Sequence, residues 1–433
     1  MTQQSLPFVT GSIKAEVSLP GSKSLANRVL LMAAVAEGES VIENLPLSKD
    51  VLAGVSALWA LGVKYCLSEA EGRIVIQGSV GRFPNEHARI FCDEAGTLTR
   101  FIIPLCAVQP SGEYYIYAAK RMMERPIADQ LMLLHKMGMK VHYASDTHKL
   151  PMTILAKSLN QQEALSIDSG KSSQFLSGLL MAAPLMQGGL KIHSNTEHPQ
   201  PYVQMTVDMM RNFGICVSVD KHYYQVTGGQ MYQACHYAIE PDLSTASYFW
   251  ALAAISNGEV KVKQVSWNTR QGDIRFLQVL EKMGCKVIEN SDGISVFGTT
   301  KLKGVSVDMR NFSDTFMTVA AIACFAEGET HITGLAHTRL QESDRVSAMA
   351  EGLTRLGVKV DMTEDGIHIY PEASKLKAGI VESHNDHRIA MSLALIGLRQ
   401  KGVIINGAEC VSKTCPDYFE RMEKIILLNQ NSR

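Results

Sequence analysis

Hydrophobic and polar positions along this chain follow a pattern that repeats six times. Each repeat opens with a small polar residue, continues as an apolar stretch with helical spacing, and closes at a glycine followed by a short β-rich run. The six closing glycines lie 70 to 76 residues apart, at Gly38, Gly112, Gly188, Gly258, Gly328 and Gly402. Because the repeats fill nearly the whole chain, we expect one supersecondary unit in six copies rather than unrelated domains.

The first repeat shows the elements that each copy predicts. Its pattern indicates a helix over 25–36, a strand over 39–45, an amphipathic helix over 48–62, and a hairpin with strands at 63–69 and 72–78. In five repeats a second glycine follows the second helix, at Gly62, Gly138, Gly214, Gly284 and Gly357. Glycine just past a helix favours the left-handed conformation, which we expect at both sets of positions.

Two proline-containing segments divide the six repeats into two groups of three. Pro20 and Pro241 flank the first three repeats, so we expect an inserted domain over 21–240. The second domain is then discontinuous, with residues 1–20 and 241–433, and holds repeats four to six. We expect N-terminal strands within 9–19 to complete the truncated sixth repeat, and an active site in the cleft between the domains.

Composition excludes several classes of function. The 433 residues are 46% hydrophobic and 20% charged, with 42 basic and 43 acidic residues and a net charge of −1. A balanced charge gives no electrostatic case for nucleic acid or an anionic membrane, and the pattern of a membrane span or signal peptide is missing from the sequence. Nine cysteines without a CxxC pair are typical of reduced thiols, so we expect a soluble, cytoplasmic protein and no metal site.

Most candidate functional residues lie at the start of the first helix of each repeat. These starts fall 13 to 15 residues before the closing glycine, at Ser24, Thr97, Ser173, Thr245, Asp314 and His387. Small polar residues there are N-caps in the simplest interpretation. Capping does not explain the nearby cations Lys23, Arg28, Arg100, Lys171 and Arg388. Because a helix N-terminus disfavours positive charge, cations at these positions indicate a site for a multiply anionic ligand.

Common nucleotide and hydrolase motifs do not fit this sequence. The GKS string at Gly170 has Leu165 where a phosphate-binding loop requires glycine. The chain also lacks a GxGxxG string after a strand and a GxSxG nucleophile elbow.

Eight strings that occur in order identify a family resemblance. They are LPGSKSLANR (19–28), AGTLTR (95–100), RMMERPI (121–127), SSQF (172–175), QGDIRF (271–276), ESDR (342–345), NDHRIAM (385–391) and KTCPDYF (413–419). Together they resemble the 5-enolpyruvylshikimate-3-phosphate synthase family over essentially the whole chain. The resemblance implies an α/β (α+β) fold of two domains, each of three βαβαββ units, known as an inverse β/α prism.

The resemblance also implies a reaction. The family transfers the enolpyruvyl group of phosphoenolpyruvate to the 5-hydroxyl of shikimate 3-phosphate through a tetrahedral intermediate and releases phosphate, in aromatic amino acid biosynthesis. This addition and elimination needs one base and one acid and no cofactor, since positioned acid–base groups can each supply roughly 10²–10⁴-fold. The implied catalytic residues are Asp314 as base for the hydroxyl, Glu342 as proton carrier at the methylene carbon, and Lys23.

Two overlapping sets of substrate-binding residues follow from the same resemblance. The phosphoenolpyruvate set is Lys23, Gly96, Arg125, Gln174, Arg345, Arg388 and Lys413. The shikimate 3-phosphate set is Lys23, Ser24, Arg28, Ser172, Ser173, Gln174, Tyr202, Asp314 and Gln341. We expect these small molecules as the partners of a monomeric enzyme, with glyphosate as an inhibitor that competes at Gly96.

Each assignment has a simpler alternative at the level of single residues. Asp314 and His387 could be helix caps, and Arg125 could be a surface turn residue before a proline. Glu342, Asp344 and Arg345 could form a solvated charge cluster, which contributes little to stability.

Two alternative functions remain to be tested against the whole chain. One is the related transferase that acts on UDP-N-acetylglucosamine, which carries Lys–Asn where this chain has Lys23–Ser24 and a loop with a reactive cysteine. The other is a non-catalytic anion-binding relative, against which the presence of both Asp314 and Glu342 argues.

Departures from the family pattern gather near the glycine loop and the shikimate 3-phosphate side. Glu94 stands for the usual Asn, Phe101 for the frequent Pro, Pro199 for a phosphate-binding Ser, His337 for an Asn and Gln341 for a Lys. They affect the expected ligand affinity more than the type of reaction.

Overall fold

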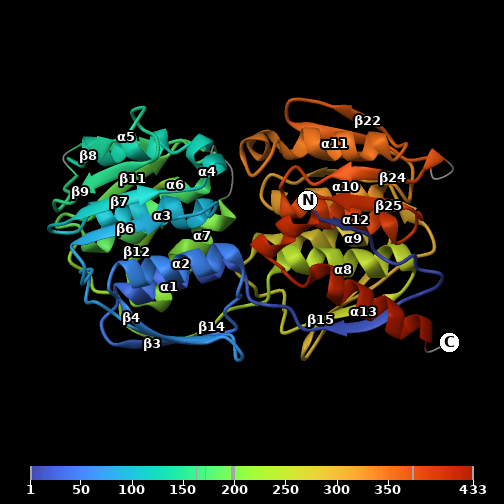
Figure 1. Cartoon of the computed structure of the whole chain (residues 1–433), viewed down its shortest axis with the longest axis horizontal. Helices are drawn as coiled ribbons and strands as arrows, with labels where there is room; N and C mark the ends of the chain where they lie inside the picture. The colour runs from blue at the N-terminus through green and yellow to red at the C-terminus, as the bar shows by residue number, and fades with distance from the viewer. Residues whose placement is uncertain (1, 162, 171, 197–199, 373–374, 432–433) are drawn as a thin grey trace. The chain divides into compact units, whose positions relative to one another are not determined.

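A computed structural model describes residues 2–431 apart from 162, 171, 197–199 and 373–374. Pro199 and Lys171 therefore lie outside the described residues. The chain forms two compact units, one of residues 21–239 and the other of residues 1–20 and 240–433 (Figure 1). We refer to them as the inserted unit and the discontinuous unit.

The inserted unit contains three four-stranded sheets with the same strand order. In each sheet the outer strand pairs in parallel with the next, and a hairpin then continues the sheet antiparallel. The strands are β14 (His236–Ala238), β3 (Glu39–Glu43), β5 (Arg73–Gln77) and β4 (Lys64–Ser68); β6 (His87–Phe91), β7 (Glu113–Tyr117), β9 (Met152–Leu155) and β8 (Lys140–Tyr143); and β10 (Leu165–Ile167), β11 (Leu190–Ser194), β13 (Tyr223–Val226) and β12 (Val217–Asp220).

Helices connect these strands into βαβαββ units. They are α1 (Lys23–Ala34), α2 (Lys49–Ala60), α3 (Gly96–Ala107), α4 (Lys120–Glu124), α5 (Ala128–Lys136), α6 (Ser173–Ala182), η1 (Ala183–Leu185) and α7 (Pro201–Asn212). The first helix of each repeat is buried along almost its whole length, and α3 packs against both α1 and α6. The first-repeat helices and strands predicted from the sequence agree with the structure to within about two residues at each end.

The discontinuous unit repeats the same design. Its sheets consist of β2 (Lys14–Val17), β15 (Glu259–Lys263), β17 (Gly293–Phe297) and β16 (Lys286–Asn290); of β19 (Ser306–Asp308), β21 (Thr330–Thr333), β23 (Gly366–Tyr370) and β22 (Lys359–Met362); and of β24 (Gly379–Glu382), β25 (Val403–Asn406) and β1 (Gln3–Gln4), with the short pair β18 (Leu302–Lys303) and β20 (Ala326–Glu327).

Its helices include a buried set of three, α8, α10 and α12, which pack together as in the inserted unit. The helices are α8 (Leu243–Ser256), η2 (Gly272–Arg275), α9 (Phe276–Lys282), η3 (Ser313–Thr315), α10 (Phe316–Ala323), η4 (Ala336–Leu340), α11 (Arg345–Arg355), α12 (His387–Gly397), η6 (Ala408–Lys413) and α13 (Tyr418–Asn431). The predicted α/β fold of repeated βαβαββ units is confirmed.

The N-terminal strands pair differently from the prediction. Strand β2, within the predicted 9–19 stretch, pairs in parallel with β15 and so completes the fourth repeat. The sixth repeat is completed by β1, which pairs antiparallel with β25. The reason is that β15 needs an outer parallel partner, and the chain arrives at α8 directly from the inserted unit. The start of the chain supplies that partner.

Most of the predicted left-handed glycines have positive φ. All five glycines that follow the second helices do, with φ between 77° and 99°. Among the closing glycines, Gly38, Gly112, Gly328 and Gly402 agree, whereas in repeats three and four the neighbouring Gly189 and Asn257 take the positive φ instead.

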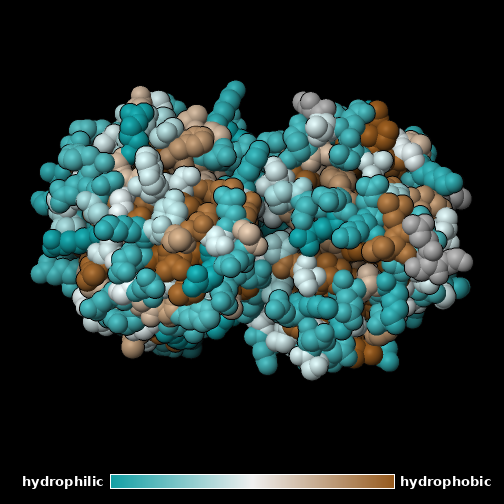
Figure 2. All heavy atoms as spheres, turned by 60° about the horizontal axis from the view of Figure 1, so that its bottom comes forward, coloured by the Kyte–Doolittle hydropathy of each residue, from teal (hydrophilic) through white to brown (hydrophobic). Residues whose placement is uncertain are grey.

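Among the described residues, twelve large hydrophobic side chains are exposed. On the face shown in Figure 2 hydrophilic residues predominate, and hydrophobic atoms appear in separate patches. Among the residues that the structure describes, none of the helices has both the length and the apolar character to cross a membrane.

Candidate active-site residues

Arg345 is the centre of a buried charge cluster in the discontinuous unit. Its side chain is 2% exposed at the first position of α11 and contacts three carboxylates. Nε donates to Asp386 Oδ2 at 2.8 Å, Nη1 to Asp314 Oδ1 at 2.9 Å, and Nη2 to Glu342 Oε2 at 2.9 Å. Burial lowers the pKa of Arg345, but the carboxylates outweigh it and raise the pKa above its ordinary value. The guanidinium therefore stays charged.

Asp314 lies between two arginines. Its second carboxylate oxygen accepts from Arg388 Nη2 at 2.9 Å, while the first accepts from Arg345. The residue belongs to the 3₁₀ turn η3 that precedes α10, and its side chain is 21% exposed. Because both oxygens point to guanidinium groups from α11 and α12, helix capping does not explain this residue. A carboxylate held by two cations and still in contact with solvent can accept a proton from a bound hydroxyl.

Glu342 connects the cluster to a lysine. One oxygen accepts from Arg345, and the other lies 3.6 Å from Nζ of Lys413, which belongs to η6. Both side chains are almost buried, so the solvated-cluster alternative is wrong for Glu342 and Arg345. It is right for Asp344, which is 40% exposed, caps α11 through Ser347 N–H and pairs with Arg339. Gln341 also accepts from Arg345.

Asp386 is a buried carboxylate that the sequence analysis did not select. It is completely buried, caps α12 by accepting from Arg388 N–H at 3.0 Å, and accepts from Ser343 Oγ at 3.0 Å as well as from Arg345. The adjacent His387 is also buried, with Nδ1 3.7 Å from Asp386 Oδ1. The sequence signal for Asp386 was its position in the NDH string, where an aspartate is also expected as an ordinary helix cap.

In the inserted unit, Lys23 pairs with a second carboxylate missed by the sequence analysis. Lys23 Nζ lies 3.1 Å from Asp50 Oδ2, and the two side chains are only 10% and 5% exposed. Lys23 begins α1, and Asp50 stands in the first turn of α2. In the sequence Asp50 is indistinguishable from any acidic residue that favours a helix N-terminus.

A hydrogen-bond network in the inserted unit orients Gln174. Arg100 Nη1 donates to Gln174 Oε1 at 2.6 Å, and Gln174 Nε2 donates to Thr97 Oγ1 at 3.1 Å. These two bonds fix the direction of the amide, because its oxygen accepts on one side while its nitrogen donates on the other. Arg100 also donates to Pro126 O at 2.9 Å, and so anchors the turn that carries Arg125.

Gly96 and Arg125 lie next to each other. Arg125 is only 8% exposed, which contradicts the surface-turn alternative. A Cβ atom on Gly96 would lie 2.7 Å from Arg125 Nη1, closer than real Cβ contacts. Glycine at this position therefore leaves room for the guanidinium itself, beyond the space that the sequence analysis reserved for a ligand.

Arg28 is buried and already hydrogen-bonded within the inserted unit. Its Nε donates to Thr206 Oγ1 at 2.7 Å, and its Nη atoms donate to Ser24 O at 2.8 Å and Tyr202 O at 3.2 Å. The guanidinium carbon lies 4.9 Å from the centre of the Phe101 ring. Burial lowers the pKa of Arg28 to about 10. Phe101 thus packs on Arg28 in the core.

The two serines that were predicted to bind shikimate 3-phosphate, Ser172 and Ser173, lie at the start of α6. Ser172 caps this helix by accepting from Gln174 N–H at 3.3 Å, and Ser173 is its first residue. Helix capping therefore accounts for Ser172, while its hydroxyl hydrogen can still be donated to an anion.

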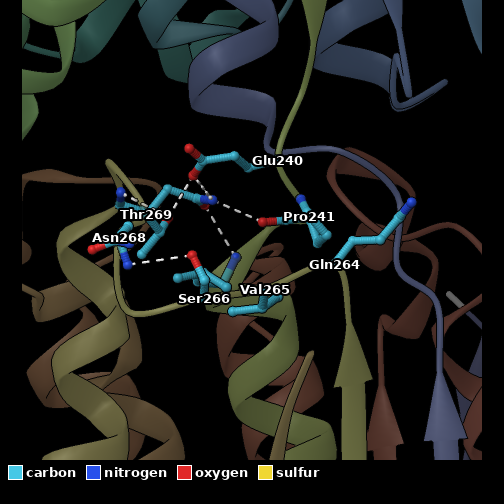
Figure 3. Close-up of a pocket in the computed structure, with 9 residues that line it drawn as sticks. Glu240, Pro241, Gln264, Val265, Ser266, Asn268 and Thr269 are labelled. Atoms are coloured by element: carbon cyan, nitrogen blue, oxygen red, sulfur yellow. Dashed lines mark hydrogen bonds between the residues drawn. The ribbon is translucent and has the colours of Figure 1, made fainter. Parts of the chain in front are cut away.

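A small pocket lies elsewhere in the discontinuous unit, where the chain enters from Ile239 (Figure 3). Its lining includes Glu240, whose carboxylate accepts from Thr269 Oγ1 and from Gln271 Nε2 at 3.3 Å. Gln271 also donates to Pro241 O at 2.8 Å. These bonds connect the loop after β15 to residues 240–241, and the lining of this pocket contains none of the predicted site residues.

Comparison with solved structures defines the class of protein. The chain matches EPSP synthase from Acinetobacter baumannii with a TM-score of 0.83 at 26% identity, covering 98% of each chain. It also matches the enolpyruvyl transferase NikO from Streptomyces tendae with a TM-score of 0.75 at 15% identity, which shows the fold alone. The repeated βαβαββ units are those of an enolpyruvyl transferase.

Sequence comparison then gives the family. The family model for EPSP synthase (3-phosphoshikimate 1-carboxyvinyltransferase) matches residues 9–422. Proteins named 3-phosphoshikimate 1-carboxyvinyltransferase are 38% identical in Trichormus variabilis, over 97% of this chain and 98% of the relative, and 41% identical in a Sulfurovum species, over 95% and 97%. The chain belongs to the EPSP synthase family. The predicted family, fold and transferase reaction of the shikimate pathway are confirmed, and the alternative functions are not favoured.

Proposed function

We propose that this chain transfers the enolpyruvyl group with Asp314 as base and Glu342 as proton carrier. Asp314 takes the proton of the 5-hydroxyl of shikimate 3-phosphate. The 5-hydroxyl oxygen then attacks the carbon of phosphoenolpyruvate that bears the phosphate group. Glu342 protonates the methylene carbon and takes that proton back when phosphate leaves. The observation that carries this proposal is that one buried guanidinium, that of Arg345, holds both carboxylates at 2.9 Å.

We further propose that residues of both units bind the same pair of substrates. The phosphoenolpyruvate side consists of Lys23, Gly96, Arg125, Gln174, Arg345, Arg388 and Lys413. Its arginine forks suit a carboxylate and a phosphate, and the geometry around Gln174 leaves an oriented amide for one more hydrogen bond.

On the shikimate 3-phosphate side we propose Lys23, Ser24, Ser172, Ser173, Gln174, Tyr202, Asp314 and Gln341. Arg28 belongs to this side through its bonds to the carbonyls of Ser24 and Tyr202, which support the local backbone of both residues. In the same proposal the enzyme is a cytoplasmic monomer, and glyphosate competes with phosphoenolpyruvate.

A phosphate-release assay tests the proposed function. Turnover with phosphoenolpyruvate is expected when shikimate 3-phosphate is the acceptor and not when UDP-N-acetylglucosamine replaces it. Asp314→Asn is expected to retain substrate binding and to lose at least about 10²-fold in turnover, the contribution expected of a positioned base. Asp344→Asn is the matched control, because it is a nearby solvated carboxylate and asparagine also caps helices. Turnover of Asp314→Asn within a few-fold of native would refute the base assignment.

A further inference from the structure

A histidine links the 3₁₀ turn that contains Asp314 to the 3₁₀ turn that precedes Glu342. His337 belongs to η4, which leads into Gln341, Glu342 and α11. Its Nε2 lies 2.8 Å from Oγ of Ser313, the residue immediately before Asp314 in η3. This contact links the segment of the base to the segment of the proton carrier, separately from the bonds that Arg345 makes to both.

Four charged groups face the His337 ring from the elements around it. Asp314 of η3 and Asp365 of the β22–β23 turn favour the charged imidazolium, whereas Arg345 of α11 and Arg310, which follows β19, oppose it. Burial is the largest influence and lowers the pKa of His337 below its ordinary value. The ring is therefore neutral near neutral pH and becomes charged only in acid.

We propose that His337 is a positioning residue for Asp314, and that its change of charge sets the acid side of the pH profile of turnover. The proposal rests on the proposed role of Asp314 as base. In its neutral form His337 holds the η3 turn through Ser313. In its protonated form it places a third cation near a carboxylate that already contacts Arg345 and Arg388.

The expected effect on the reaction follows from basicity. A nearby positive charge stabilises the ionised carboxylate, and a more stable carboxylate is a weaker base. As the pH falls, turnover should therefore decline when His337 becomes protonated. A residue that only filled space would leave the position of this decline unchanged.

Two variants separate the charge of His337 from its hydrogen bond. His337→Asn keeps an amide that can bond to Ser313 but cannot titrate in this range. Its acid limb of kcat/KM is expected to move to lower pH by about one unit, because the titrating ring is gone and carboxylates ordinarily titrate below histidine. Ser313→Ala removes the bond and keeps the titrating ring, so kcat is expected to fall several-fold while the acid limb stays in place.

The control is His331→Asn, in β21 of the same unit, where the ring stacks on His368 at 4.3 Å. Its profile is expected to match that of the native enzyme. A second readout is independent of activity: the Cε1–H resonance of His337, assigned by its loss in His337→Asn. In Asp314→Asn this resonance is expected to titrate at lower pH than in the native protein, because the carboxylate that favours imidazolium is gone.

Three outcomes would overturn the inference. They are a His337→Asn profile that superimposes on the native one, a uniform loss of activity with an unshifted acid limb, and a Ser313→Ala variant with native kcat. Turnover by Asp314→Asn would instead refute the proposed base, and the resonance titration distinguishes that failure from an error about His337.

Discussion

The two units place their charged residues in different ways. In the discontinuous unit, Arg345 joins three carboxylates into one cluster, which extends to Arg388 and Lys413. In the inserted unit the charges are dispersed, with Lys23 paired to Asp50, Arg28 bonded to main-chain carbonyls and Arg100 bonded to an amide. Carboxylates that can exchange protons are thus concentrated in the first case, whereas cations and hydrogen-bond donors dominate in the second.

This difference indicates that two copies of one architecture have different roles. A cluster with several acidic groups requires a central cation, since like charges at short distance disfavour ionisation. Dispersed cations serve a different purpose, because each can be held by a neighbour and still attract an anion. We therefore expect substitutions in the discontinuous unit to act on turnover and stability, and those in the inserted unit to act mainly on substrate affinity.

The largest effect is expected from Arg345→Met. The variant leaves Asp314, Glu342 and Asp386 around an uncharged side chain, and breaking such a buried arrangement costs about 3–5 kcal/mol of the free energy of unfolding. The loss should shrink as the pH is lowered, because protonation relieves the repulsion among the carboxylates. Urea unfolding at several pH values measures it. Arg339→Met is the control, since its partner Asp344 is 40% exposed and such pairs contribute up to about 1 kcal/mol.

An intermediate effect is expected from Asp50→Asn in the inserted unit. The change keeps the shape of the side chain and removes the charge beside Lys23, at a cost of about 1–3 kcal/mol for a less well satisfied buried group. KM for both substrates should rise more than kcat falls, because Lys23 loses its charged partner and is less firmly oriented. Steady-state kinetics with each substrate varied in turn check this. A fall in kcat with native KM values would remove the distinction drawn between the units.

The smallest effect on stability is expected from Gly96→Ala. The new methyl group meets the end of a flexible side chain, Arg125, so we expect a loss at the low end of the roughly 1–3 kcal/mol typical of overpacking. Displacement of the guanidinium should raise KM for phosphoenolpyruvate and weaken inhibition by glyphosate, with less change for shikimate 3-phosphate. Competition of glyphosate against phosphoenolpyruvate in both proteins is the measurement. Native values in the variant would show that Arg125 moves aside without consequence.

Local features of the fold were predictable because they depend on residues that are close together in the sequence. The glycines after the second helices need positive φ, which Gly62 and its four counterparts adopt, and apolar spacing located the first-repeat helices. Strand partners were less predictable, because a short segment such as β1 or β2 can complete any sheet with an open edge. That choice depends on the path of the whole chain.

The candidate site shows the same limit. Motif strings located Arg345 and Glu342, and the alignment of helix starts located Asp314, but Asp50 and Asp386 were not selected. Each stands near a helix start, where an acidic residue is favourable without any partner. Their importance comes from cations 27 and 41 residues away, Lys23 and Arg345, and only the folded chain brings these groups together.

The closeness of the two ends of the inserted unit has a consequence for the gene. Asn44 Nδ2 donates to Ile239 O at 2.9 Å, and a Cβ on Gly21 would lie 2.7 Å from Ile239 Cγ2. On the other side of the crossings, Asp242 N–H donates to Pro20 O at 3.0 Å. The first and last residues of the segment 21–239 are therefore close together, and so are Pro20 and Asp242, which flank it in the discontinuous unit. Because its two ends are close together, such a segment can be exchanged as a unit between homologous genes. It can also be circularly permuted to new termini.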